Sequence, residues 1–135
     1  MFSRFLRTDG LNGGLAQRSV AGDGIAANIN ESVIAADANA TLSINDIAGG
    51  AVQFTGFTAG RNITTPTAAQ ILAAAPDMNI GDSFALLIST VAAFAGTFVA
   101  NTGVTLAGRS TVPASSFSIV IVKRTGAAAF TWRVL

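Results

Sequence analysis

Short apolar stretches alternate with turn residues along most of the chain, from Gly24 to the C-terminus. In many of them hydrophobic and polar side chains alternate one by one, which is the period of a half-buried β-strand. These segments are ATLSI, GGAVQFTGF, GRNIT, SFALLIST, GTFVA, GVTLAG, SSFSIVIVKR and AFTWRVL. Strands at spacings of roughly 10 residues with turn signals between them are typical of a β-sandwich or barrel. We therefore expect an all-β fold, with a β-sandwich or jelly-roll-like domain over residues 25–135 and an extended N-terminal arm over residues 1–24.

One stretch, TTPTAAQILAAAPDMNIGDSF, carries the signals of a helix. Thr67 followed three residues later by Gln70 makes a capping box, and Pro76 cannot continue a helix. The pattern predicts one short α-helix at about 67–75, the only helix expected in the chain. Because two turns are not stable alone in water, Ile71 and Leu72 must hold this helix against a larger core.

The alternation within the longest strands also predicts which side chains form the core. SSFSIVIVKR is apolar on both sides, because Val120 and Val122 alternate with larger residues, so we expect both of its sides to be covered. The predicted core is Phe84, Leu86, Ile88, Phe117, Ile119, Ile121, Phe130 and Trp132.

Two stretches fit more than one structure. GIAANINESVIAAD reads as an irregular strand, yet Ile25, Ile29 and Val33 also follow a helical spacing. FALLISTVAAFAGTFVA has no charged residue and approaches the length of a membrane helix. Its β-branched residues and its alternation favour two strands, and a membrane-associated protein is the weaker alternative.

The composition indicates a chain that lives inside an assembly. Only 11% of its residues are charged and 50% are hydrophobic, whereas about a quarter of an ordinary soluble domain is charged. Such a surface is poorly protected against association, so neighbouring molecules are expected to cover much of it. The net charge of +1 gives no electrostatic reason to expect nucleic acid as a partner.

The side chains offer little for catalysis. The sequence has no cysteine, histidine or tyrosine, which excludes thiolate nucleophiles and histidine-activated serines. Asp77 and Asp82 stand in turn sequences, where aspartate commonly bonds to nearby backbone amides. Lys123 and Arg124 are interpreted as a solvated strand end or a charge pair with a neighbour. We expect that the protein is not an enzyme and that it has no cofactor, no metal site and no small-molecule substrate.

The N-terminus, MFSRFLRTDGLNGG, combines apolar and basic residues before a glycine-rich stretch. It lacks the apolar centre of a secretory signal. We expect it to be an arm that binds a neighbouring protein, and a frayed terminus is the alternative. Its candidate anchors are Phe2, Arg4, Phe5, Leu6 and Arg7.

Three segments, TTPTAAQILAAAPDMNIGDSFALLI, GVTLAG and SSFSIVIV, occur in this order between Ile63 and about Val122. Together they resemble a recurring module of tailed-bacteriophage virion proteins, namely capsid cement (decoration) proteins and related fibre domains. The resemblance covers rather less than half of the chain. It implies a β-rich homotrimer that binds the major capsid protein on the outer surface of the head shell and stabilises its joints. The alternative from the same resemblance is a fibre or receptor-binding domain.

Overall fold

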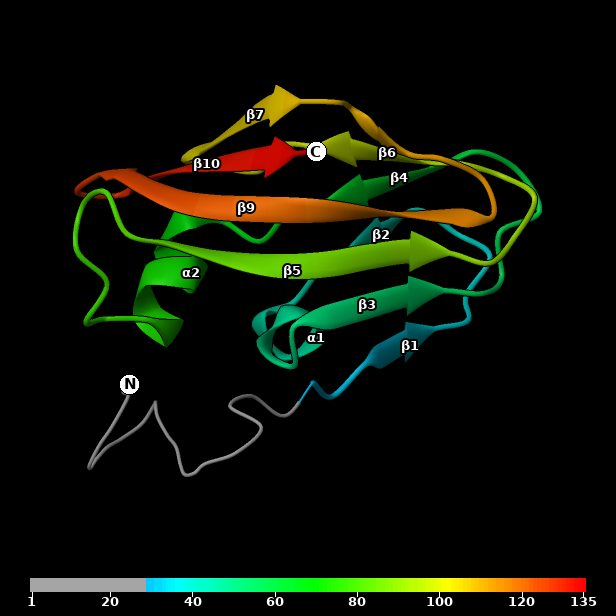
Figure 1. Cartoon of the computed structure of the whole chain (residues 1–135), viewed down its shortest axis with the longest axis horizontal. Helices are drawn as coiled ribbons and strands as arrows, with labels where there is room; N and C mark the ends of the chain where they lie inside the picture. Colours follow the sequence, from blue (N-terminus) through cyan, green and yellow to red (C-terminus); the bar gives the residue numbers. More distant parts are fainter. Residues whose placement is uncertain (1–28) are drawn as a thin grey trace.

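The computed structural model describes residues 29–135, which form two mixed β-sheets and two short helices (Figure 1). The six-stranded sheet has the order β1 (Ser32–Ile34), β3 (Ala51–Phe54), β5 (Ser83–Thr90), β9 (Ser116–Gly126), β10 (Ala129–Val134) and β7 (Val104–Gly108). The four-stranded sheet has the order β2 (Ala40–Thr41), β4 (Arg61–Thr64), β6 (Gly96–Val99) and β8 (Thr111–Val112). The helices are α1 (Ile44–Ala48) and α2 (Ala68–Ala74). A mostly β fold is therefore confirmed.

The first part of the domain repeats one path. The chain passes through a strand of the larger sheet, a strand of the smaller sheet and a helix, first as β1, β2 and α1 and then as β3, β4 and α2. It begins the path again with β5 and β6. Successive strands pair in parallel, β1 with β3 and β5 in one sheet, and β2 with β4 and β6 in the other. Each passage, which we call a coil, stacks on the previous one as in solenoid proteins.

The remaining strands close the domain. β8 pairs antiparallel with β6, and β9 pairs antiparallel with β5. β9 and β10 form a hairpin, and β7 lies parallel to β10 at the edge of the larger sheet. The third coil has a turn where the earlier ones have a helix, and the Ala68 N–H of α2 donates to the carbonyl of Thr102 in this turn at 2.9 Å. Gly103 follows with φ +79°, and a Cβ there would lie 2.6 Å from Cβ of Ala68.

Both helices begin with a capping box. The Thr67 hydroxyl accepts from the Gln70 N–H and Oε1 of Gln70 accepts from the Thr67 N–H, as predicted, and α2 matches the expected helix at 67–75. The prediction of a single helix is wrong. Ser43 and Asp46 form the same reciprocal pair at the start of α1, so ATLSI leaves the strand after Thr41. In this short segment local capping overrides the alternating pattern.

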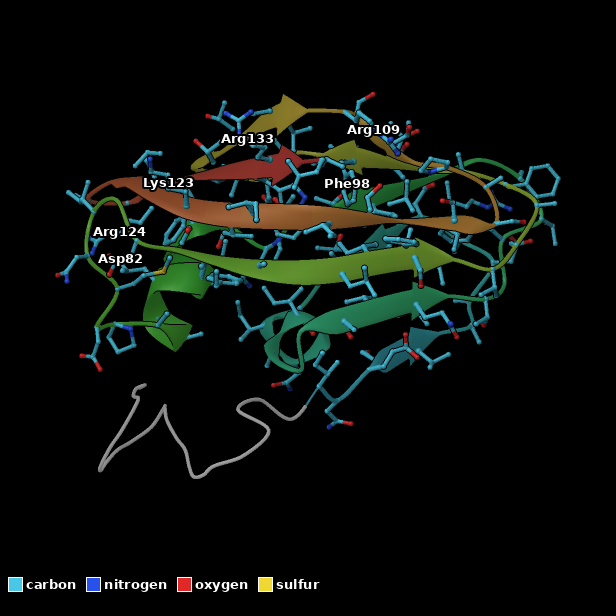
Figure 2. All side chains as sticks on the ribbon, viewed as in Figure 1. Asp82, Phe98, Arg109, Lys123, Arg124 and Arg133 are labelled. Carbon is cyan, nitrogen blue, oxygen red and sulfur yellow. The ribbon has the colours of Figure 1, made fainter. Side chains whose placement is uncertain are left out.

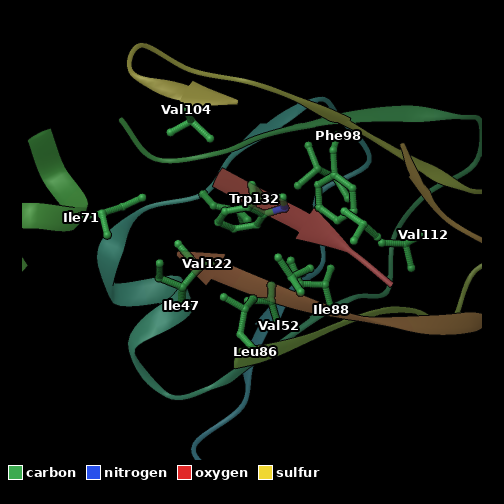
Figure 3. Packing of buried hydrophobic residues seen from close by; sticks show 14 of the residues in the cluster. Ile47, Val52, Ile71, Leu86, Ile88, Phe98, Val104, Val112, Val122 and Trp132 are labelled. Atoms are coloured by element: carbon green, nitrogen blue, oxygen red, sulfur yellow. The ribbon is translucent and has the colours of Figure 1, made fainter. Parts of the chain in front are cut away.

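The core lies between the two sheets, with the helices at one end (Figures 1 and 3). Trp132 on β10 is fully buried near its centre and packs against Phe98 of β6, with 6.0 Å between the ring centroids. Leu86, Ile88 and Phe130 are buried as predicted, and Phe84 is partly buried against the same cluster. Ile71 is buried and Leu72 packs at its margin, which confirms how α2 is held.

The prediction of which side of β9 faces the core is wrong. Phe117 is 58% exposed and Ile119 is 42% exposed, whereas Val120 and Val122 are completely buried. The antiparallel register with β5 explains the result, because Leu86 stands opposite Val120 and residues in register share a face. Ile121, on the same side as Ile119, is only half-buried.

The two ambiguous stretches are resolved as strands where the structure describes them. Val33 lies in β1, and the apolar run from Phe84 to Ala100 forms most of β5 and then β6. Among residues 29–135 no helix is long and apolar enough to cross a membrane.

Candidate interaction surface

The six-stranded sheet has one face on the core and one facing away from it, which we call the outer face. Its strands alternate, so that Leu86, Ile88 and Val120 point inward while their neighbours point outward. Facing outward are Val33, Gln53, Ala85, Leu87, Ser89, Phe117, Ile119 and Ile121. Neither helix nor the smaller sheet covers this face in Figure 1.

Apolar side chains dominate the middle of the outer face. Leu87 stands opposite Ile119, and Ala85 stands opposite Ile121, across the central pair β5 and β9. Val33 adds a side chain that is 57% exposed on β1. Single exposed apolar residues are normal on proteins, but a contiguous group on a flat sheet marks an interaction site. The outer face is therefore the best candidate for a functional surface in the described part of the chain.

A shallow hollow of about 350 Å³ lies at one end of this face. Its lining includes Gln53, Ser89 and Phe117, which stand side by side on β3, β5 and β9. A second, more apolar pocket of about 410 Å³ lies between the helices and β5, lined by Ile44, Ile71 and Phe84 among others. Neither hollow is lined by a charged side chain; the lining of the first is mostly polar and uncharged, whereas the second is suited to apolar contact.

The polar clusters of the domain join structural elements. Asp37, between β1 and β2, accepts from the side chain of Thr58 and, at 2.9 Å, from the Thr58 N–H. Arg61 adds a bond from Nε at 3.0 Å and an ion pair at 2.9 Å. These interactions, with the Thr58 hydroxyl contributing most, lower the pKa of Asp37 from 3.8 to about 2. The cluster ties the turn of the first coil to that of the second.

Arg124 performs a similar task at the other end of the sheet. Its guanidinium donates to the carbonyls of Met78 at 2.5 Å, Gly126 at 3.1 Å and Ala127 at 2.8 Å. It thereby joins the loop after α2 to the β9–β10 turn, so the expectation of a solvated strand end is wrong for this residue, while an ion pair with a neighbour stays a prediction. In the same loop the carboxylate of Asp82 accepts from the Asn79 N–H at 2.8 Å, which confirms its interpretation as a turn former.

The described residues contain no group of three or more acidic, histidine or cysteine side chains that could hold a metal ion. The predicted anchors of the arm, Phe2, Arg4, Phe5, Leu6 and Arg7, lie outside the described residues, as does the arm as a whole.

The surface that sequence reasoning missed is the outer face, because Phe117 and Ile119 were placed in the core. The hairpin of β9 and β10 gave no usable signal for the buried face, because its register is irregular. A regular hairpin closed by Gly126 and Ala129 would set Trp132 opposite Lys123, on the side of Ile119, whereas the register shift between Ala129 and Phe130 sets it opposite Val122. Comparison with protein families, curated proteins and solved structures finds no match to this chain.

Proposed function

We propose that this chain is a structural capsid cement (decoration) protein of a tailed bacteriophage. As a homotrimer it binds the major capsid protein on the outer surface of the head shell and stabilises the joints between shell subunits. The observation that carries the proposal is the open apolar outer face, with Phe117 58% and Ile119 42% exposed on a well-packed domain. A charged fraction of 11% and the resemblance of residues 63–122 support the same conclusion.

A cement function follows from simple physical chemistry. A trimer that spans several shell subunits adds buried area across their joints, and each patch acts three times by symmetry. Individual contacts can be weak, because binding at one point raises the effective concentration at the others. The scaffold is suited to this task, since Asp37 and Arg124 each fasten loops that are far apart in sequence.

Within the mostly β class we propose a β-sandwich rather than a jelly roll. Two sheets enclose one core, with Trp132 of the larger sheet against Phe98 of the smaller. Parallel pairs begin both sheets, whereas a jelly roll is built from antiparallel Greek keys. An experimental structure of the assembled protein tests this assignment through the order of its strands.

The arm keeps its proposed role as the capsid anchor. Phe2, Phe5 and Leu6 offer apolar contacts, and Arg4 and Arg7 offer hydrogen bonds to acidic or carbonyl groups of the shell. Deletion of residues 1–14 is expected to leave the domain folded and to abolish binding to heads. Normal decoration by the truncated chain would refute this role.

The decisive experiment uses heads from a phage that encodes this chain, prepared without it. Purified full-length protein is mixed with these heads, and bound copies are located by cryo-electron microscopy. We expect repeated density on the outer shell in groups of three and heads that open at a higher temperature. Absence of binding contradicts the proposal. Density at a tail tip in the intact virion favours the fibre or receptor-binding alternative.

A further inference from the structure

The outer face carries a charge pattern as well as an apolar centre. Glu31 lies two residues before Val33, on the same side of an extended segment, and so flanks the face at its β1 side. Arg133 on β10 flanks it at the other side, and Lys123 lies at the end of β9, the strand next to β10 (Figure 2). All three side chains are exposed, and none forms an ion pair with another described residue.

The register places these charges relative to the apolar residues. Arg133 stands opposite Ile121, which stands opposite Ala85, and all three point outward. Val33 begins the outward row that continues through Gln53, Ser89 and Phe117. One side of the face is therefore acidic, its centre is apolar, and its other side is basic.

The outer face is large enough for a specific interface. Six strands at a spacing of about 4.8 Å make a sheet about 29 Å wide. At about 3.3 Å per residue, the longer strands extend beyond about 25 Å. Because β1, β3, β7 and β10 are shorter than this, the projected area of the six strands is on the order of 600 Å², before the relief of the side chains is added. A standard interface buries about 800 Å² on each partner.

We propose that the outer face binds further copies of this chain, with the β1 side of one copy against the β10 side of the next. In a closed ring the acidic side of each copy meets the basic side of its neighbour, so that Glu31 faces Arg133 and Lys123 across every interface. Leu87, Ile119 and Ile121 turn toward the symmetry axis. The inference rests on the homotrimer of the proposed function and names the surface that forms it.

Cyclic symmetry suits this pattern for a physical reason. A head-to-tail interface joins two different patches of the same chain, and each copy must carry both. The acidic and basic sides of the outer face are two such patches, at β1 and β10, the first and fifth strands of the sheet order. Burial of the apolar centre supplies the main driving force, while the charges fix the orientation of the copies.

Ile119→Lys in the full-length chain tests the apolar centre. The side chain points away from the core, so the domain should still fold, which circular dichroism checks. Native mass spectrometry and light scattering should show a trimer of the 13.6 kDa chain for wild type and a monomer for the variant. We expect the concentration for half-assembly to rise at least about 100-fold, since a charge would be buried in an apolar contact.

Ile80→Lys is the matched control. Ile80 is 62% exposed but lies in the loop between α2 and β5, outside the outer face. The same chemical change should leave the trimer intact there. A monomeric wild-type protein, or a trimer that survives Ile119→Lys, would overturn the inference.

A charge exchange tests the orientation. Glu31→Arg and Arg133→Glu should each weaken assembly several-fold, because each places like charges across the interface. The double variant should recover most of the loss, since it exchanges the two sides. Two single changes whose effects simply add would contradict the proposed orientation.

Head binding separates this inference from the proposed function. If Ile119→Lys dissociates the trimer but the wild-type trimer never binds heads, the outer face is supported as the trimer interface and the proposed cement function is refuted. If heads are decorated and the variant remains trimeric, the cement function stands and the surface assigned here is wrong.

Discussion

The side-chain Oδ1 of Asn39 accepts a hydrogen bond of 2.9 Å from the backbone N–H of Asn62. The two asparagines occupy matching places in successive coils, since Ala40 and Ile63, the next residues, are direct partners in the β2–β4 pair. The side chain of Asn39 therefore continues the ladder beyond the two-residue strand β2. The short smaller sheet gains one more bond between coils than its backbone provides.

Asn39→Ala removes this bond and leaves the Asn62 N–H to water. The site is exposed, so we expect a loss of about 0.5–1 kcal/mol in the free energy of unfolding. Asn39→Asp keeps an acceptor oxygen in the same place and is the control, with a loss smaller than that of alanine. Urea unfolding followed by circular dichroism measures both, and equal losses would show that the acceptor is unimportant.

The lowered pKa of Asp37 predicts how the free energy of unfolding depends on pH. Its pKa is lowered to about 2 in the folded chain, against 3.8 for the ordinary carboxyl, chiefly because the Thr58 hydroxyl donates to the charged form. A lowered pKa means that the stabilisation is complete above about pH 4 and is lost as the pH falls through 2. Wild type should therefore lose more stability between pH 5 and pH 2 than Asp37→Asn.

Thr58→Val provides a second test of the same carboxylate. It removes the side-chain donor, so the pKa of Asp37 should rise toward its ordinary value. Carboxyl chemical shifts measured by NMR across pH 1.5–6 report this directly. A wild-type Asp37 that titrates near pH 4 would contradict the cluster seen in the structure.

The helices show how far local signals reach. The Thr67–Gln70 pair was recognisable because Pro66 and Pro76 bracket it and good helix formers follow. Ser43–Asp46 makes the same box, yet it lies in an alternating stretch and uses aspartate in place of glutamate or glutamine. α1 has five residues, too few for a helical period to emerge from the sequence.

The faces of β9 show where the pattern stops being informative. Phe117, Ile119 and Ile121 are larger than Ser118, Val120 and Val122, and size alone favours the wrong set for the core. The choice is made by partners that are remote in sequence, since Val120 and Val122 stand opposite Leu86 and Phe84 of β5. A two-residue period identifies two faces but does not say which one is buried. The candidate surface was therefore beyond the reach of the pattern read strand by strand.

Substitutions of Arg124 test whether its charge or the planar geometry of its guanidinium stabilises the two loops that it joins. Its planar guanidinium donates hydrogen bonds to three backbone carbonyls, those of Met78, Gly126 and Ala127. Arg124→Met should lower the free energy of unfolding by about 1–3 kcal/mol, because charged hydrogen bonds are lost. Arg124→Lys keeps the charge but not the fork of donors, so it should recover only part of the loss. Full recovery by lysine, measured by urea unfolding, would mean that charge alone matters.

Trp132 gives the sharpest test of the core. It is fully buried between the sheets and is the single tryptophan of the chain, so its fluorescence should be blue-shifted in the native state and move to the red on unfolding. Trp132→Ala removes a whole ring from this core and should cost about 3–5 kcal/mol, or prevent folding. Trp132→Phe retains an aromatic ring against Phe98 and should cost less, which keeps the test informative if the alanine variant does not fold.

Phe94→Ala is the control for Trp132→Ala, since Phe94 is 42% exposed in the loop after β5 and the loss of free energy of unfolding should remain within about 0.5 kcal/mol. Similar losses for Trp132→Ala and Phe94→Ala, measured by circular dichroism, would mean that the sheets do not enclose Trp132 in solution.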